Sequence, residues 1–267
     1  MHPILFHIGP LVVRTYGALV ALAFLVALRV ARWGAHLRKI DEVFLLDLTA
    51  VLVLSGLIGA RLLYVLLNMT YYVEHPWDSV KIWEGGLVFY GGFLLASAAG
   101  IWYVRWKGFS VGKVADILAP ALALGQAVGR WACFFAGCCY GRPTTLPWGI
   151  RFSDPASLAP LGVDLHPTQL YESFGDLLIG LVLWLQLIRK KDSDGEIFWL
   201  YILLYAALRF GVEFARGDDR GPTIGGLYPS QLIALIAMLV SASVLIAQAA
   251  SKSNFNHGPI TENYQRR

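Results

Sequence analysis

Four arginines lie within or at the edge of long apolar stretches of this sequence: Arg14, Arg61, Arg130 and Arg209. A charged side chain is costly inside a bilayer, so it usually lines a cavity or pairs with an opposite charge. Arginine stays ionised at physiological pH, and its planar guanidinium can bind a phosphate or carboxylate through two N–H groups. The chemistry that these residues offer is therefore the binding of an anion.

Three cysteines follow Arg130 in the stretch GRWACFFAGCCYGRP at 129–143. They are too few for a disulfide framework in a chain of this length. We expect Cys133 to be a small packing residue, and Cys138 and Cys139 lie on the oxidising side, where a disulfide with each other or with another thiol stays open. We expect no metal site, because Cys133 faces a helix and His166 has no second histidine at ligand spacing.

The composition is that of a membrane protein. Hydrophobic residues make up 57% of the 267 residues and charged residues 15%, against roughly 25% charged residues in ordinary soluble domains. Apolar stretches near or above ~20 residues are long enough to cross a bilayer as helices. We therefore expect an all-α, polytopic integral membrane protein that needs no cofactor and has no nucleic-acid partner.

Seven stretches are expected to span the membrane: 11–31, 43–67, 90–104, 114–137, 168–188, 196–215 and 229–249. They form one domain, residues 1–250, with an outer excursion at about 138–167 and a flexible cytoplasmic tail at 251–267. The start of the chain lacks the order of a secretory signal peptide, so we expect the first span to be retained.

Lysine and arginine are concentrated in the segments on one side of these spans, which include Arg105, Lys107, Lys113 and the run Arg189–Lys191. Cytoplasmic loops carry such an excess. The N-terminus is therefore expected outside and the C-terminus in the cytoplasm, with all four intramembrane arginines in the outer half.

Arg130 and Arg209 each lie about seven residues from the outer end of their span, which places both ~10 Å below it. Two guanidinium groups at one depth predict a clamp for the head group of an anionic phospholipid. Tyr16, Tyr90, His166 and Glu172 are expected near that depth, and Tyr205 and Glu213 lie one turn on either side of Arg209. A snorkelling side chain or a pair with a nearby carboxylate remains the alternative for each arginine.

His166 has the only nearby side chain whose ordinary pKa suits proton transfer at neutral pH. The alternative is an ordinary loop histidine before a proline. Two similar stretches, HPTQLYES at 166–173 and YPSQLIAL at 228–235, are each expected to begin a helix, with the hydroxyl of Thr168 or Ser230 capping free backbone N–H groups.

The chain resembles the prolipoprotein diacylglyceryl transferases of the bacterial inner membrane. The resemblance covers nearly the whole sequence, through YGALVALAF, GARLLYVL, WEGGLVFYGG, GRWACFFAGCCYGRP, HPTQLYE and LRFGVEFARGDDRG. It implies transfer of a diacylglyceryl group from phosphatidylglycerol to the lipobox cysteine of a secreted prolipoprotein, with release of glycerol phosphate. By motif position it implicates Tyr16, Arg130, Gly141, His166, Arg209 and Glu213.

The sequence departs from the strictest family signature at two places. Cys133, Ala136 and Cys138 stand where Asn, Asn and Glu are typical, and Tyr90 replaces a histidine that is discussed as a base. A tyrosine of ordinary pKa, about 10, is a poor base at neutral pH. The departures therefore concern proton transfer, while Tyr16 and Tyr90 remain candidates for orienting head-group hydroxyls.

Two other classes of function are open to the residues alone. An anion transporter would carry polar groups through the full depth of the membrane, whereas the inner halves of these spans are nearly all apolar. A membrane thiol oxidoreductase would lose its activity when all three cysteines became serine. A transferase, whose nucleophilic sulfur belongs to its substrate, is expected to keep its activity.

Overall fold

The computed structural model describes residues 4–8, 11–190 and 194–256. In these residues the chain forms seven long helices: α1 (Thr15–Leu37), α2 (Glu42–Leu67), α4 (Phe89–Trp106), α5 (Val111–Ala136), α6 (Thr168–Arg189), α7 (Glu196–Glu213) and α8 (Pro229–Asn256). Five of them, α1, α2, α5, α6 and α8, are long and apolar enough to cross a membrane. The prediction of a helical, multi-pass membrane protein is confirmed.

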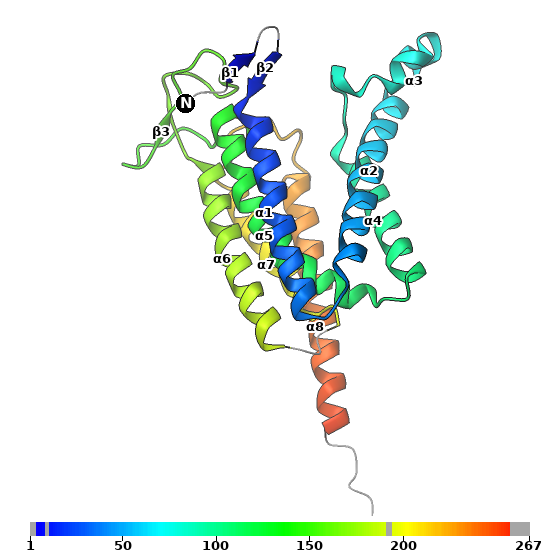
Figure 1. The fold of residues 1–267 in the computed structure, drawn as a ribbon. Helices are drawn as coiled ribbons and strands as arrows, with labels where there is room; N and C mark the ends of the chain where they lie inside the picture. The colour runs from blue at the N-terminus through cyan, green and yellow to red at the C-terminus, as the bar shows by residue number, and fades with distance from the viewer. Residues whose placement is uncertain (1–3, 9–10, 191–193, 257–267) are drawn as a thin grey trace, which may run out of the picture.

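Helix α5 is the centre of the main bundle and packs against α1, α6 and α7 (Figure 1). Half of the most apolar 18-residue stretch of α5 is buried, whereas only 11% of the corresponding stretch of α8 is buried. Small residues make this possible, because Ala119 and Ala123 let neighbouring backbones approach closely, and both are fully buried. The helix that carries Arg130 is therefore held on several sides.

Helices α2 and α4 form a second packing unit that lies beside the bundle, with the short α3 (Met69–Glu74) at its upper end (Figure 1). A Cβ on Gly59 would lie 2.4 Å from the carbonyl oxygen of Gly91, so the two backbones touch. The unit joins the bundle through buried residues near one end, where Leu45 packs with Ala31 and Ile117. Tyr90, in the first turn of α4, belongs to this second unit.

The first predicted span is corrected at its start. Leu11–Arg14 forms strand β2, which pairs antiparallel with β1 (Ile4–Ile8), and α1 begins only at Thr15. Val12 and Val13 are β-branched and favour a strand when a partner strand is available. Arg14 therefore precedes the first span and does not lie within it.

Residues 137–167, between α5 and α6, contain a short antiparallel pair, β3 (Ile150–Arg151) and β4 (Asp164–Leu165). Arg151 donates two hydrogen bonds to Asp164, and this pairing holds the pKa of the Asp164 carboxyl below its usual value. At the other end of the chain α8 continues to Asn256, so residues 251–256 of the expected tail are helical. The remainder of that predicted tail, 257–267, lies outside the described residues.

Both stretches with a Gln-Leu pair do begin helices, at Thr168 and at Pro229. The expected cap is wrong for the first: Thr168 donates its hydroxyl hydrogen bond to the carbonyl of Cys139, and no side chain caps α6. At α8 it is Gln231 that accepts from the backbone N–H of Tyr228. The hydroxyl of Thr168 thus ties the cysteine loop to α6.

Candidate active site

Glu172, on α6, is the residue on which arginines from two other helices converge. Arg130 of α5 places Nε 2.6 Å from Glu172 Oε2, and Arg209 of α7 donates from Nη1 to Oε1. Glu172 is 1% exposed, and a carboxylate so far from water is tolerated only when charges pair with it. The two arginines that the sequence predicts at one depth therefore meet at one carboxylate.

Arg130 retains unused hydrogen-bond donors. Its ion pair with Glu172 uses Nε, and among the described residues its two terminal amino groups have no hydrogen-bond partner. The side chain is 19% exposed, so these amino groups are not sealed within the protein. An anion can bind there in the bidentate manner typical of guanidinium groups without displacing Glu172.

Glu213 holds Arg209 from the other side. Its Oε2 lies 2.8 Å from Arg209 Nη2, one turn back on α7, and its Oε1 accepts from Arg220 at 2.8 Å. Glu213 is 1% exposed. The predicted pairing of Arg209 with Glu213 is found, and it fixes the guanidinium between two carboxylates.

Arg216 extends the cluster beyond the end of α7 and is a residue that sequence analysis missed. It makes two hydrogen bonds with Asp218, at 2.8 and 2.7 Å, and its Nη1 lies 3.8 Å from Glu172 Oε1. The run ARGDDRG at 215–221 has the charges of a solvated loop, so only the fold shows that Arg216 is buried.

Asp176 lies one helical turn after Glu172 and is fully buried. Neither of its carboxylate oxygens has a hydrogen-bond partner among the described residues. The charges of Arg130 and Arg209 act on it through space. Sequence analysis missed this carboxylate too, although its spacing of four from Glu172 places both on one face of a helix.

The loop 138–143 lies between the start of α6 and the segment that follows α7. Gly141 donates its backbone hydrogen bond to His166, and Arg142 donates to Ala215. A Cβ on Gly141 would lie 2.4 Å from the Cβ of His166 and 2.8 Å from the oxygen of Ala215. Only glycine fits this position, so the residue has a structural role whether or not it contacts a substrate.

The ring of His166 contacts Tyr171, whose hydroxyl lies 3.2 Å from Nδ1. That hydroxyl also accepts a hydrogen bond from Trp148 Nε1 at 2.8 Å. No contact described for the ring joins it to Arg130 or Arg209. Its role as a proton carrier therefore stays a prediction.

The three tyrosines singled out in the sequence lie in different surroundings. Tyr205 stacks on Tyr201, with ring centroids 5.8 Å apart, and senses the charges of Arg130 and Arg209. Tyr16 lies in the first turn of α1, within electrostatic range of Arg130 and the three thiols. Tyr90 is 60% exposed on α4, and its described ring contact is with Phe89. Tyr205 thus lies within electrostatic range of both arginines, whereas the ring contact described for Tyr90 leaves it apart.

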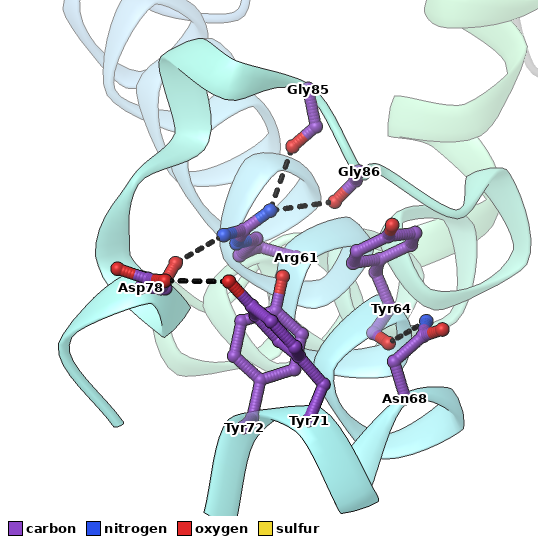
Figure 2. A pocket seen from close by; sticks show the side chains of 8 residues that line it. All are labelled: Arg61, Tyr64, Asn68, Tyr71, Tyr72, Asp78, Gly85 and Gly86. Atoms are coloured by element: carbon purple, nitrogen blue, oxygen red, sulfur yellow. Dashed lines mark hydrogen bonds between the residues drawn. The ribbon is translucent and has the colours of Figure 1, made fainter. Parts of the chain in front are cut away.

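Arg61 is engaged in a separate pocket of about 430 Å³ beside α2 and α3 (Figure 2). Its guanidinium donates to the backbone carbonyls of Asp78, Ser79, Gly85 and Gly86. The ring of Tyr72 lies 5.5 Å from its central carbon. Arg61 therefore anchors the loop before α4. These contacts favour a structural role for Arg61 over a role in binding an anion.

The side chains of Cys133, Cys138 and Cys139 converge. All three sulfur atoms lie within 4.8 Å of one another, and each side chain is partly exposed. Cys133 was expected to face a helix; it also lies beside the two loop thiols, because the chain reverses at Gly137, whose φ of 75° brings the next two residues back over the end of α5.

The chain is similar over nearly its whole length to known proteins. The family model described as prolipoprotein diacylglyceryl transferase matches residues 3–247. A phosphatidylglycerol–prolipoprotein diacylglyceryl transferase of Clostridium tetani is 35% identical over 91% of this chain and 96% of its own. A protein of the same name from Thermotoga maritima is 36% identical over 88% of this chain and 81% of its own.

A match of this extent covers all the elements that surround Glu172, from α1 to most of α8. The residues of the arginine cluster and of the cysteine loop lie inside the matched range. The chain therefore belongs to the prolipoprotein diacylglyceryl transferase family.

Proposed function

We propose that this chain transfers the diacylglyceryl group of phosphatidylglycerol to the lipobox cysteine thiol of secreted prolipoproteins, forming a thioether and releasing glycerol phosphate. This is the first step of bacterial lipoprotein maturation. The observation that carries the proposal is the pair Arg130 and Arg209 on Glu172, in which Arg130 keeps two amino groups for an anion. The names of the similar proteins supply the substrates.

In this proposal the phosphate of phosphatidylglycerol binds the terminal amino groups of Arg130, with Arg209 beside it. The substrate thiolate attacks the glycerol carbon next to the phosphodiester oxygen, so a C–S bond forms while a C–O bond breaks. The bonding electron pair stays on the phosphate oxygen. Charge that develops in a poorly hydrated site is where fixed positive groups lower a barrier most.

Glu172 and Glu213 act as positioning residues in the same scheme. Both guanidinium groups are held in place before the lipid arrives, so little reorganisation is needed when the phosphate gains charge. Tyr205 and Tyr16 orient the head group, Gly141 keeps the cysteine loop against His166, and His166 carries a proton. Tyr90 is assigned to the path of the lipid, because it is exposed on α4.

We further propose seven membrane spans, with the N-terminus outside, the C-terminus in the cytoplasm and the site in the outer, periplasmic half. Seven helices of 18 residues or more among those described support the count. Helix α7 has 18 residues and carries Glu196, Arg209 and Glu213. In this proposal it spans the membrane because its charged side chains pair with opposite charges. The single domain 1–250 and its outer excursion belong to this proposal.

The test mixes purified full-length protein with phosphatidylglycerol vesicles and a lipobox peptide and measures the peptide's mass. The wild type is expected to add a diacylglyceryl group, and Arg209→Ala is expected to abolish the addition while the protein still inserts into the membrane. Arg151→Ala, which removes an exposed arginine of β3, is the matched control and should transfer normally. Near-normal transfer by Arg209→Ala would reject the role of the arginine pair.

A further inference from the structure

The three thiols form a compact group that the proposed function leaves without a role. Cys133 lies in the last turn of α5, and Cys138 and Cys139 follow the turn at Gly137. Their sulfur atoms lie within 4.8 Å of one another, and each side chain is partly exposed. At such distances two thiols can be joined by a disulfide after rotation of their side chains.

The turn at the end of α5 selects Cys133 and Cys138. The backbone N–H of Gly137 donates to the carbonyl of Phe134 at 3.2 Å, and that of Cys138 donates to the carbonyl of Cys133 at 3.1 Å. With Gly137 in a left-handed conformation, these two bonds form a Schellman motif, whose two outer residues commonly bring their side chains into contact. Here both outer residues are cysteines, and Cys138 Sγ lies 3.7 Å from the carbonyl oxygen of Cys133.

Cys139 is less suited to pair with either thiol. Consecutive Cα atoms lie about 3.8 Å apart across a trans peptide bond, whereas Cα atoms joined by a disulfide usually lie about 4.4–6.8 Å apart. A bond between Cys138 and Cys139 would therefore be strained. Cys139 is also held from outside the group, because Thr168 donates to its carbonyl at 2.7 Å and the charge of Arg216 acts on its thiol.

We propose that Cys133 and Cys138 form a disulfide in the folded protein, which cross-links the last turn of α5 to the cysteine loop and leaves Cys139 as a free thiol. The inference rests on the proposed function for one point, the orientation that places the end of α5 at the outer face. Disulfides form and persist on that side of the membrane, because thiols are not kept reduced there. The thiols that the structure describes are the reactants.

The oxidation balances when the oxidant is the disulfide of an extracytoplasmic thiol–disulfide oxidoreductase. The thiolate of Cys138 attacks one sulfur of that disulfide and forms a mixed disulfide, and the thiolate of Cys133 then attacks Sγ of Cys138. The bond between Cys133 and Cys138 forms while the bond to the oxidoreductase breaks. Two electrons pass to the oxidoreductase, whose two sulfur atoms take up the two protons that the cysteines lose.

The bond compensates for two departures from the family signature. Cys133 and Cys138 stand where Asn and Glu are typical, and amide and carboxylate groups form strong hydrogen bonds. A thiol is a weak donor and a weak acceptor, so two thiols hold a turn less firmly than these groups can. A covalent bond removes that weakness, and it requires cysteine at both contacting positions of the motif at once.

The cross-link joins the helix of Arg130 to the loop that rests on the helix of Glu172. Arg130 lies about one turn before Cys133 on α5, and Gln169 of α6 donates to the carbonyl of Cys138 at 2.7 Å. A disulfide here restricts the unfolded chain and so stabilises the folded one, but it supplies no group to the transfer step. Transfer is therefore expected to survive loss of the cysteines, at a lower thermal stability.

The first test counts thiols in the full-length wild type. Membranes that contain the protein are quenched in acid to stop thiol exchange, and the denatured protein is labelled with N-ethylmaleimide before or after reduction. One label is expected before reduction and three after it, and the fragment masses of the labelled peptide should place the single label on Cys139. Any other count before reduction, or a label on Cys133 or Cys138, would overturn the pairing.

The second test uses Cys139→Ser, a variant that keeps the proposed pair. It is expected to take no label before reduction and two after it. Cys133→Ser is the matched control, because it removes one member of the pair and should take two labels without reduction. Two labels on unreduced Cys139→Ser would overturn the proposal, and the absence of free thiols in Cys133→Ser would contradict the selection of the pair by the Schellman motif.

The third test measures the unfolding midpoint in detergent with and without a reductant. Reduction should lower the midpoint of the wild type by about 4–8 °C, the shift expected when a short cross-linked loop is opened in a chain of this size. The double variant Cys133→Ser, Cys138→Ser should unfold at one temperature under both conditions. An unchanged midpoint in the wild type, or equal falls in both proteins, would reject the stabilising role of the cross-link.

Thiol counting and unfolding involve neither the lipid nor the peptide, so the cross-link and the transferase activity are tested independently. A protein that has the cross-link and transfers nothing would reject the proposed function alone. Normal transfer by a protein with three free thiols would reject the cross-link alone.

Discussion

Arg130 and Arg209 bind opposite oxygens of the same buried carboxylate, that of Glu172. The arrangement brings two positive charges from different helices together in a region where water is scarce. Removal of one partner from a buried ion pair leaves the others uncompensated, which costs more than the pair itself contributes. The stability of the cluster therefore depends on the Glu172 carboxylate as well as on the two arginines.

Glu172→Gln removes the shared negative charge and is expected to destabilise the protein by about 3–5 kcal/mol, the range found when one member of a buried ion pair is lost. Thermal unfolding in detergent is the measurement. Vesicles or micelles that contain phosphatidylglycerol should restore part of the lost stability, because the lipid phosphate can replace the carboxylate. Phosphatidylcholine should restore less.

Asp164→Asn is the control for that prediction, because it breaks the exposed pair with Arg151. Exposed ion pairs contribute about 0–1 kcal/mol. If the two variants unfolded at the same temperature, the buried character of the Glu172 pair would be contradicted.

Gly141→Ala is expected to displace the cysteine loop, because the new Cβ would lie 2.4 Å from the Cβ of His166 and 2.5 Å from its oxygen. Both thermal stability and transfer should fall. Gly17→Ala is the matched control: its added Cβ meets nothing within 4 Å, and alanine favours a helix over glycine by up to about 1 kcal/mol. Equal thermal stability and equal transfer in the two variants would contradict the close approach at Gly141.

Arg61→Lys is expected to loosen the segment between α3 and α4 although the charge is kept. The guanidinium donates to four backbone carbonyls in a fixed fork, and an ammonium on a flexible stem cannot reproduce that geometry. Hydrogen exchange of residues 76–88 should accelerate, while residues 150–165 keep their rate. Unchanged exchange in 76–88 would mean that Arg61 does not anchor this loop.

Asp116→Asn tests the junction between α5 and the start of α7. The two carboxylate oxygens accept from the backbone N–H groups of Gly195 and Phe198, at 3.0 and 2.8 Å. An amide offers only one acceptor oxygen, so one buried N–H is left without a partner at a cost of about 1–3 kcal/mol. The unfolding midpoint should fall, and lipid transfer at low temperature should not. A loss of transfer without a loss of stability would place Asp116 in the chemistry instead.

The sequence by itself determined where the membrane helices lie, because the length and apolarity of a span are local properties. It also predicts one depth for Arg130 and Arg209, from their distance to the ends of their spans, and it indicates the pairing of Arg209 with Glu213, from helical spacing. The predictions for the first span and for Thr168 were wrong because both depend on a partner distant in the sequence. Strand β2 forms because β1 pairs with it, and the Thr168 hydroxyl donates to the carbonyl of Cys139.

Only the tertiary structure decided which faces of these helices meet. It made Glu172 the common partner of two arginines, joined Arg216 to them from a loop, and gathered three thiols from a helix end and the turn that follows it. It also separated Arg61 from the arginines at Glu172 by giving it backbone carbonyls as partners. The physical reason is that helical periodicity fixes each residue's direction about its own axis, while close packing between small residues fixes how the axes are placed.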